Sequence, residues 1–343
     1  MNIKAFRSTL SNNSFTLPIA ILYVTEGCNL QCIMCSYRDP RTDELSLSEI
    51  QSLAQSLHNY GLRHIVFSGG EPLLRKDFPQ ISQAFTSLEV KQTLLTNGLL
   101  LNKRYNEIKD SFSEIIISID GPDAVTHNSI RGIDAFSQIV KGIETVLATS
   151  PKQNISIRTV LQNKNYRRLA DIIQFAKSVG VSRISFLAAD VLSESFGRYD
   201  HELVKNKEDI ILNEEDIASF RTIIDETSVR FKSDFDSGFI SESPEKLHKL
   251  ASYYSALLGK NEFPQVLCNA PNVSAVIQSN GEILPCFFLP EYGNIRSTPI
   301  EETLNSPSIQ TTRTQVKNCE LERCKTCVCS LYVSPKQALL DGF

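Results

Sequence analysis

The sequence predicts an α/β fold of six β/α units, followed by a small cysteine-rich α+β module. Short apolar runs recur between residues 19 and 188, and helix-like apolar spacing separates them. This alternation is typical of parallel strands joined by right-handed crossovers. The cysteines fall into two groups, one before residue 36 and one after residue 267, which sets the C-terminal part of the chain apart.

The predicted strands and helices follow one another regularly. The strands are expected at 19–24, 64–68, 90–96, 114–119, 154–161 and 183–188. The helices between them are expected at 46–60, 77–86, 102–110, 134–148 and 166–179. The first helix begins at a capping box formed by Ser46 and Glu49, and it ends before Gly61. Six units fall short of the eight of a complete TIM barrel, so we expect an open or partial (β/α)6 TIM-like barrel.

Composition and charge narrow the possible partners. The chain has 343 residues, 41% of them hydrophobic, and a net charge of −4, as in an ordinary globular protein. It contains no block of basic residues, so we do not expect a nucleic-acid partner. The apolar run at 17–24 is too short to cross a bilayer, and we expect no membrane or targeting segment. Clustered cysteines favour metal binding and a reducing, cytoplasmic compartment over a disulfide framework.

We expect four regions along the chain. They are a barrel core at 18–190, a helical bridge at 191–262, a cysteine-rich module at 263–332 and a tail at 333–343. Within the module, Asn280-Gly281 lies between two apolar runs and predicts a β-hairpin. This hairpin would bring Cys268 and Cys286 toward each other.

Three closely spaced thiols follow the first predicted strand. Cys28, Cys32 and Cys35 lie within eight residues, in what should be a loop at the end of a strand. Three thiolates are one ligand short of a closed tetrahedral site. A [4Fe–4S] cluster held by three cysteines would leave one iron open to a substrate or cofactor. The alternative is three buried cysteines without a ligand role, although cysteines this close among polar residues are rarely packing residues.

The Cys-x3-Cys-x2-Cys pattern resembles the signature of the radical S-adenosylmethionine (radical SAM) superfamily. The resemblance implies that the open iron chelates the amino and carboxylate groups of S-adenosylmethionine. It also implies that reduction of the cluster yields a 5′-deoxyadenosyl radical, which abstracts a hydrogen atom from a substrate. Met34 stands where the family usually has an aromatic residue, and we include it among the cofactor-binding residues.

Two motifs at later strand ends resemble cofactor-binding motifs of this family. Gly69-Gly70-Glu71 is similar to the Gly-Gly-Glu motif, which implies contact with the methionine amino group, and the Glu71 carboxylate could receive that ammonium. Asn97 belongs to a Thr-Asn-Gly sequence that is also found near the cofactor in the family. Either motif could also be a simple turn, but the position of the glycine pair one β/α unit after the cysteine loop favours a role for it.

The fourth and fifth predicted strands add further candidates. Ser118 and Asp120 share one face of a strand end, where family members hold the cofactor ribose, although Asp-Gly-Pro is also turn chemistry. Arg131 ends a His-x3-Arg-Gly segment that resembles one in the family, and it would pair with the methionine carboxylate or stay at the surface. Arg158 lies mid-strand and should reach cofactor, substrate or a neighbouring acid.

The C-terminal cysteines predict a second site. Two of them lie at the hairpin, and a Cys-x2-Cys loop could complete a four-thiolate site for a cluster or for structural zinc; the four are Cys268, Cys286, Cys324 and Cys327. The Cys-x12-Gly-x4-Cys spacing resembles the SPASM/Twitch extension of radical SAM enzymes. That resemblance implies one or two auxiliary [4Fe–4S] clusters. Cys319 and Cys329 are spare, and either could replace one of the four ligands.

Two hypotheses of function follow. The first is a radical SAM oxidoreductase-type enzyme that oxidises, or forms a bond on, a peptide or a small metabolite such as a sugar alcohol. Such an enzyme would need an electron donor such as flavodoxin or ferredoxin. The second is a zinc-stabilised α/β binding or scaffold protein, which would leave the three-thiol loop without a fourth ligand.

Overall fold

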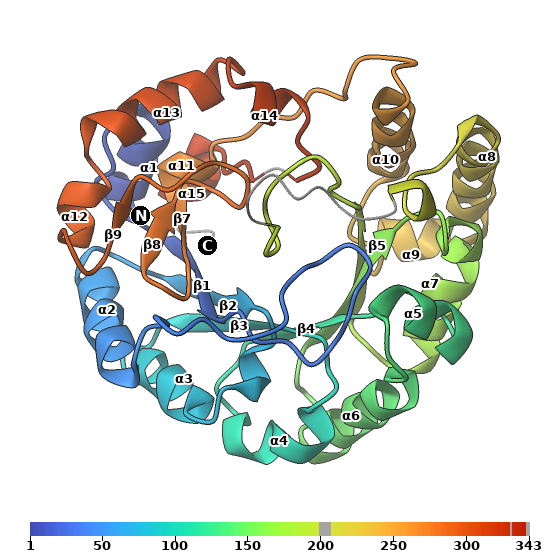
Figure 1. Ribbon diagram of the computed structural model, residues 1–343, viewed down its shortest axis with the longest axis horizontal. Helices are drawn as coiled ribbons and strands as arrows, with labels where there is room; N and C mark the ends of the chain where they lie inside the picture. Colours follow the sequence, from blue (N-terminus) through green and yellow to red (C-terminus); the bar gives the residue numbers. More distant parts are fainter. Residues whose placement is uncertain (199–206, 330, 341–343) are drawn as a thin grey trace.

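A curved sheet with helices around its outer face forms the core of the protein (Figure 1). The computed structural model describes residues 1–198, 207–329 and 331–340, and within these residues nine strands form one sheet in the order β6-β5-β4-β3-β2-β1-β7-β8-β9. Its parallel strands in chain order are β1 (Ile19–Thr25), β2 (His64–Gly69), β3 (Lys91–Thr96), β4 (Glu114–Ser118), β5 (Ile155–Leu161) and β6 (Arg183–Ala188). The predicted partial (β/α)6 barrel is therefore confirmed.

The helices that cover the barrel lie where the apolar spacing predicts them, with bounds that differ by only a few residues. They are α2 (Leu47–Asn59), α3 (Phe78–Thr86), α4 (Leu101–Ile108), α6 (Phe136–Thr149) and α7 (Leu169–Ser178), with short 3₁₀ turns η1 (Pro72–Leu74) and η2 (Tyr166–Arg168). The capping box of Ser46 and Glu49 at the start of α2 is confirmed. Fully buried Phe67 of β2 meets Phe78 and Phe85 of α3 edge-on, which ties the sheet to this helix layer.

The cysteine-rich module continues the barrel sheet. The predicted hairpin is formed by β7 (Ser274–Ile277) and β8 (Glu282–Leu284), and β9 (Gly293–Asn294) adds a third strand. Gly281 turns the hairpin with a φ of 87°, a conformation that favours glycine. β7 also pairs in parallel with β1, so that Ala275 lies beside Ala20. The spacing of apolar residues could not reveal this pairing, because it joins segments about 250 residues apart in sequence.

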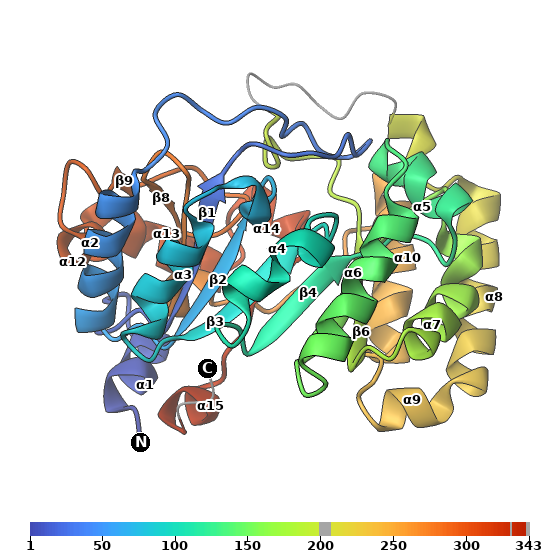
Figure 2. The same ribbon diagram turned by 90° about the horizontal axis from the view of Figure 1, so that it is seen from below.

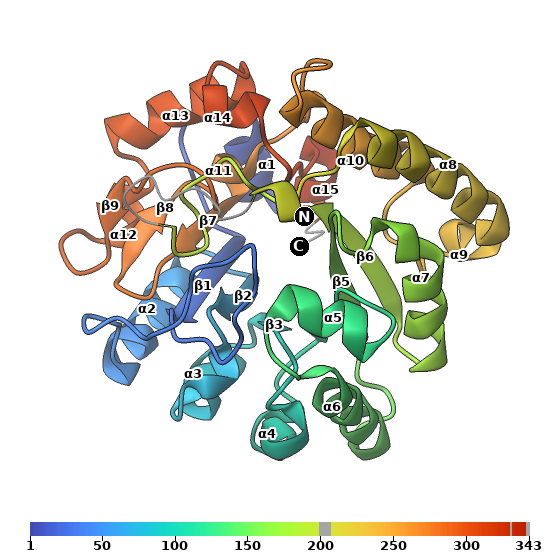
Figure 3. The same cartoon turned by 45° about the vertical axis from the view of Figure 1, so that its right-hand side comes forward.

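Apart from α5 (Ala124–Arg131), which lies at the rim of the barrel beside α6, most of the remaining helices lie near the two edges of the sheet (Figure 3). The remaining helices are α1 (Ile3–Leu10), α5 (Ala124–Arg131), η3 (Lys207–Asp209), α8 (Glu214–Arg230), α9 (Lys232–Asp236), α10 (Pro244–Leu257), α11 (Ala270–Val273), α12 (Ile300–Thr303), α13 (Pro307–Lys317), α14 (Glu322–Lys325) and α15 (Pro335–Leu339). Figure 3 shows α7, α8, α9 and α10 gathered beside β5 and β6. We predicted no helix at α5, where the sequence analysis recognised only the motif that ends in Arg131.

The loops at the carboxyl ends of the strands gather at one rim of the barrel. In Figure 2 the loop that follows β1 crosses this rim, on the side opposite to the two chain ends, where α1 and α15 lie. Strand ends of this kind carry the active sites of parallel barrels. Within the described parts of the chain, no helix combines the length and the apolar character needed to cross a membrane.

The glycine loop after β2 packs directly against the backbone after β1. The Gly70 N–H donates to Thr25 O at 2.8 Å, and the Glu71 N–H donates to Gly27 O at 2.8 Å. A Cβ at Gly69 or Gly70 would lie 2.2 Å from a carbonyl oxygen of this neighbouring backbone, so only glycine permits the approach. The two loops that follow β1 and β2 are thereby held as one unit.

The Glu71 carboxylate supports this unit from inside the protein. It has no solvent exposure and accepts hydrogen bonds from Leu73 N–H at 3.0 Å, Thr96 Oγ1 at 2.8 Å and Asn97 N–H at 2.7 Å. Burial raises the pKa of Glu71 to about 7, and these three donors only partly oppose the rise. The side chain therefore links the glycine loop to the end of β3.

We predict that Glu71→Gln changes the pH dependence of stability. From about pH 4.3, where an exposed Glu loses its proton, to about pH 7, the folded wild type binds one proton more than the unfolded chain. Its free energy of unfolding should therefore fall by about 1.4 kcal/mol per pH unit over this window. Gln does not titrate, so the difference between wild type and variant should shrink as the pH rises.

Urea denaturation at pH 5, 6 and 7 measures this difference. Glu301→Gln, at an exposed position in α12, is the matched control and should show a difference that is independent of pH. A constant difference for Glu71→Gln as well would contradict the prediction.

Candidate functional site

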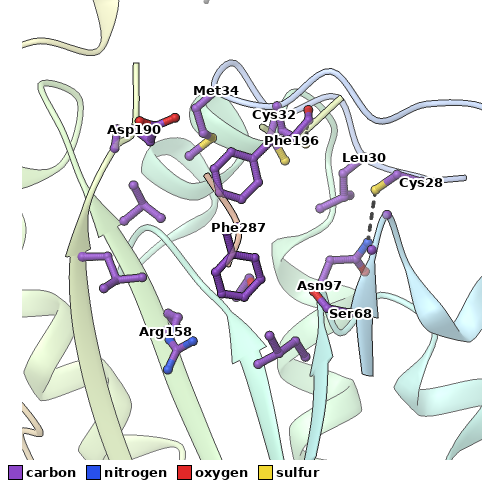
Figure 4. Close-up of a pocket in the computed structure, with 18 of the residues that line it drawn as sticks. Cys28, Leu30, Cys32, Met34, Ser68, Asn97, Arg158, Asp190, Phe196 and Phe287 are labelled. Atoms are coloured by element: carbon purple, nitrogen blue, oxygen red, sulfur yellow. Dashed lines mark hydrogen bonds between the residues drawn. The ribbon is translucent and has the colours of Figure 1, made fainter. Parts of the chain in front are cut away.

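The first cysteine loop closes a cavity of about 280 Å³ at the barrel rim. Cys28, Cys32 and Cys35 all line it, together with Met34 (Figure 4). Its further walls come from the ends of the parallel strands and are largely apolar; they include Leu95, Ile116, Val160 and Leu187. The structure therefore brings the predicted cysteines to one cavity at the carboxyl ends of the strands.

Each of the three sulfur atoms has a polar neighbour. Asn97 Nδ2 lies 4.0 Å from Cys28 Sγ, Arg131 Nη1 lies 3.7 Å from Cys32 Sγ, and Cys35 Sγ donates to the Phe196 carbonyl at 3.6 Å. Burial raises the pKa of Cys28, and it raises that of Cys35 to about 12. Buried thiolates need a compensating positive charge, which iron cations would provide. The three free cysteines fit a cluster that they bind through three of its irons.

Most of the other predicted cofactor-binding residues also line this cavity. Gly69 and Gly70 do so at the end of β2, Asn97 after β3, Ser118 at the end of β4 and Arg131 from α5. Ser68 lies beside the two glycines and is part of the same wall (Figure 4). The loops after β1, β2 and β3 and the end of β4 thus contribute to one chamber.

Two predicted contacts are not supported by the geometry. The Glu71 carboxylate, expected to receive an ammonium, points into the protein and is occupied by its three donors. The Asp120 carboxylate, expected near a ribose, is also fully buried. It lies 2.7 Å from Arg131 Nε and accepts a hydrogen bond from Val160 N–H at 2.8 Å. Both acids hold the chamber walls together instead of facing the chamber.

The two candidate arginines differ in their partners. The ion pair with Asp120 holds Arg131, and this arginine also lies beside Cys32. Arg158 lines the cavity from β5, next to Ser118 of β4 in the sheet register. Its Nε donates to Ser185 Oγ at 3.3 Å, and it forms no ion pair within the described residues. The guanidinium of Arg158 is therefore the better placed of the two to meet an anionic group in the cavity.

The C-terminal cysteines gather at a second, smaller cavity. All six line a space of about 80 Å³: Cys268, Cys286, Cys319, Cys324, Cys327 and Cys329. Burial raises the pKa of Cys324 to about 11, and that of both Cys286 and Cys327 to about 12. The four predicted ligands and the two spare cysteines therefore line the same cavity.

The cysteines in both cavities stand too far apart to bind one common metal ion. Within residues 1–198, 207–329 and 331–340, no three Cys, His, Asp or Glu side chains are grouped closely enough to hold a single metal ion. The cysteines of a [4Fe–4S] cluster each bind a different iron, so they stand farther apart than the ligands of one ion.

Aromatic residues separate the 280 Å³ cavity at the first cysteine loop, called the catalytic cavity below, from two adjoining cavities. Phe287 and Phe288 line both the catalytic cavity and the cysteine cavity, as does Cys329. A third cavity, of about 570 Å³, shares Phe287, Phe288, Tyr23 and Phe196 with the catalytic cavity. The sequence analysis missed this wall. Phe287-Phe288 directly follows Cys286 and could have been noticed, whereas Phe196 carries no comparable signal.

Family models match both cysteine-containing parts of the chain. The radical SAM superfamily model matches residues 22–176, and the SPASM model, described as an iron–sulfur cluster-binding domain, matches residues 268–328. The second match favours an iron–sulfur cluster over structural zinc. The boundaries that we predict between the four regions stay predictions.

Curated relatives are similar over part or most of the chain. A probable GTP 3′,8-cyclase of Sulfolobus acidocaldarius is 28% identical over 168 residues, which are 48% of this chain and 53% of the relative. The chain spans 53% to 65% of the first cyclases that it matches. An AdoMet-dependent heme synthase of Methanosarcina barkeri is 27% identical over 287 residues, or 81% of this chain and 79% of the relative.

Solved structures share the fold over nearly the whole chain. SuiB of Streptococcus suis bound to its precursor peptide SuiA has a TM-score of 0.66 at 17% identity, over 94% of this chain and 73% of SuiB. The structure of anSMEcpe with bound AdoMet and a peptide has a TM-score of 0.61 at 22% identity, over 95% of both chains. The chain thus belongs to the radical SAM superfamily, whose members hold S-adenosylmethionine on a [4Fe–4S] cluster, and it carries a C-terminal SPASM domain for an auxiliary iron–sulfur cluster.

Proposed function

We propose that this protein cleaves S-adenosylmethionine reductively and oxidises, or forms a bond on, a peptide substrate. The observation that carries the proposal is the convergence of Cys28, Cys32 and Cys35 on one cavity with the glycine loop and with Arg158, which forms no ion pair among the described residues. Bound there, a [4Fe–4S] cluster with S-adenosylmethionine would supply the 5′-deoxyadenosyl radical that abstracts hydrogen. An electron donor such as flavodoxin or ferredoxin would provide the electron.

The residues around the cavity have separable roles in this proposal. The three cysteines hold the cluster, and the close backbone of Gly69 and Gly70 accommodates the methionine end of the cofactor. Arg158 binds its carboxylate, and the Ser118 hydroxyl beside Arg158 accepts or donates a further hydrogen bond. Asn97 and Arg131 direct N–H groups at the sulfur atoms of Cys28 and Cys32, where they stabilise negative charge.

The walls of the cavity keep water from the reacting atoms. Leu95, Ile116, Val160 and Leu187 supply apolar side chains from four neighbouring strands, and Phe287 closes the side toward the larger cavity. A reactive radical must be shielded in this way from side reactions. The same low polarity strengthens the pairing of Arg158 with a carboxylate.

The two joined cavities favour a peptide over a small metabolite such as a sugar alcohol. A cofactor bound beside the cysteines would take up much of the 280 Å³ cavity, which leaves the adjoining 570 Å³ cavity for the substrate. That larger space is lined by charged and hydroxyl side chains, such as Glu282, Glu291 and Ser195, which suits the polar backbone of a peptide. The peptides in the SuiB and anSMEcpe structures are consistent with this choice.

Iron analysis after anaerobic purification and reconstitution tests the proposal. One catalytic and one auxiliary [4Fe–4S] cluster require about eight irons per chain, and a second auxiliary cluster would raise this to about twelve. Incubation with S-adenosylmethionine and a reductant should release 5′-deoxyadenosine. A colourless protein that binds zinc without iron or sulfide would overturn the proposal.

We predict that Cys32→Ala abolishes the release of 5′-deoxyadenosine, because the catalytic cluster loses one of three ligands. About four irons per chain should remain at the C-terminal cysteines. Chromatography of the nucleoside products and iron analysis check both results. Cleavage at the wild-type rate would show that the loop of residues 28–35 is not the catalytic site.

We predict that Arg158→Met weakens the binding of S-adenosylmethionine by at least about tenfold, because hydrogen bonds to a charged group are lost. The iron content should not change, since among the described residues Arg158 forms no hydrogen bond to a cysteine and donates instead to Ser185 Oγ. Equilibrium binding to the reconstituted protein measures the loss. The control is Arg183→Met on β6, where the arginine is half-exposed and pairs with Glu114 away from the cavity. An unchanged dissociation constant for Arg158→Met would contradict the assignment.

A further inference from the structure

The loop of residues 190–198 lies between the two cysteine sites. It follows β6, and Asp190 and Phe196 from this loop line the catalytic cavity. Figure 4 shows Phe196 beside Met34 and Cys32, with Asp190 on the neighbouring side of the cavity. The loop contains none of the sequence motifs that predict the two cysteine sites.

Buried polar contacts hold the loop as one piece. Arg198 has a side chain that is 1% exposed, and its Nη2 lies 2.5 Å from Asp190 Oδ2. The same guanidinium donates to the carbonyls of Asp190 at 2.8 Å and Ser195 at 2.7 Å. The Ser193 hydroxyl also donates to the Asp190 carboxylate. The first and last residues of the loop are thus tied together.

One side of the loop supports the catalytic cysteines. The Phe196 carbonyl accepts hydrogen bonds from Ser36 N–H at 2.9 Å and from Cys35 Sγ at 3.6 Å. A Cβ at Gly197 would lie 2.9 Å from Tyr37 N, so the two backbones are in close contact. Phe196 has a φ of 65°, a strained conformation that the surrounding contacts must hold.

The other side of the loop reaches the C-terminal cysteines. Asp190 Oδ1 pairs with Nη2 of Arg323, the residue before Cys324. Ser195 Oγ donates at 2.5 Å to the carbonyl of Phe287, the residue after Cys286. A continuous set of hydrogen bonds and ion pairs therefore joins Cys35 to both segments of the SPASM domain that carry these cysteines.

Asp190 is the shared member of this set. Its side chain is 1% exposed and lies between two guanidinium groups, those of Arg198 and Arg323. Arg323 also lies over the Phe288 ring at 4.8 Å, against the wall between the cavities. Removing one partner from a buried ion pair leaves the other charge uncompensated, which is strongly destabilising. Loss of the Arg323 contact should therefore displace the segment that holds Cys324.

We infer that the loop of residues 190–198 fixes the auxiliary cluster site against the catalytic cavity, and that Asp190 is its positioning residue through the ion pair with Arg323. The inference rests on the proposed function, since it concerns the binding sites of the two proposed clusters. It assigns Asp190 a role in cluster environment and not in the chemistry of hydrogen abstraction.

The test uses a protein that carries Cys28→Ala, Cys32→Ala and Cys35→Ala, so that only the auxiliary cluster contributes to the electron paramagnetic resonance signal. Into it are introduced Asp190→Asn, Arg323→Met, both together, and the conservative Arg323→Lys. The control is Glu322→Gln. This change removes the exposed ion pair between Glu322 and Lys325, and Glu322 directly precedes Arg323 in the sequence. Release of iron to a chelator, the resonance spectrum and the midpoint potential are measured.

We expect Asp190→Asn and Arg323→Met each to release iron about tenfold faster than the parent, with an altered spectrum and a shifted potential, because a buried charge loses its partner. Arg323→Lys should restore most of the parental behaviour, and Glu322→Gln should match the parent. The double variant should be no faster than the faster single variant, because both remove the same contact. If Arg323→Met released iron at the rate of the parent and kept the parent's midpoint potential, the inference would be overturned.

The iron content of the parent protein distinguishes a failure of the inference from a failure of the proposed function. A parent that binds no iron would refute the auxiliary site itself, and with it that part of the proposed function. A parent with about four irons whose variants behave alike would refute only the inference. Should the protein that lacks Cys28, Cys32 and Cys35 fail to fold, alkylation is measured instead on the iron-free protein that keeps all its native cysteines. There, Cys324 should react about tenfold faster in Arg323→Met than in Glu322→Gln, and equal rates would overturn the inference.

Discussion

The two-sided pairing of β1 is the constraint on which the rest of the structure depends. On one edge β1 pairs with β2, which leads into the glycine loop, and on the other it pairs with β7, which leads through the hairpin to Cys286. The catalytic cysteine loop leaves the end of the same strand. Three segments with chemical roles are thus ordered by one strand that is buried along nearly all of its length. The hydrogen-bond register of β1 with β2 and β7 therefore sets the relative positions of the three segments.

Buried charge gives the rim of the barrel its rigidity. Asp120 with Arg131, and Asp190 with Arg198 and Arg323, form pairs in which each acid is almost without exposure. Such pairs contribute little net stability, because desolvation offsets the attraction, but they enforce a specific geometry since breaking them is costly. Arg158 differs, because it lines the cavity and among the described residues forms no ion pair; Glu242 acts on it electrostatically without forming one. A cation without an ion-pair partner in an apolar chamber is suited to an anionic ligand.

The sequence predicted the parallel strands and both cysteine sites, because periodic apolar runs and short cysteine spacings are local signals. It did not predict where side chains point. Glu71 and Asp120 follow strands, as ligand-binding acids do, yet tertiary donors turn both toward the protein interior. The pairing of β7 with β1 depends on contacts between distant segments, and so does the position of the loop of residues 190–198. No local sequence pattern predicts such contacts. Asp190, at the end of β6, could have been flagged by the same strand-end rule that selected Asp120.

The shared wall of the cavities sets a physical requirement for catalysis in the proposed function. Phe287, Phe288 and Phe196 line both the catalytic cavity and the larger cavity, so a substrate group in the larger cavity would pass these rings to reach a cofactor bound beside Cys28, Cys32 and Cys35. Rotating aromatic side chains requires far less free energy than moving the backbone that the 190–198 loop holds in place. The backbone around the two cysteine sites can therefore stay fixed while the rings yield to substrate. In the proposed function, rings that return to their positions around a bound substrate would exclude water while the radical is present.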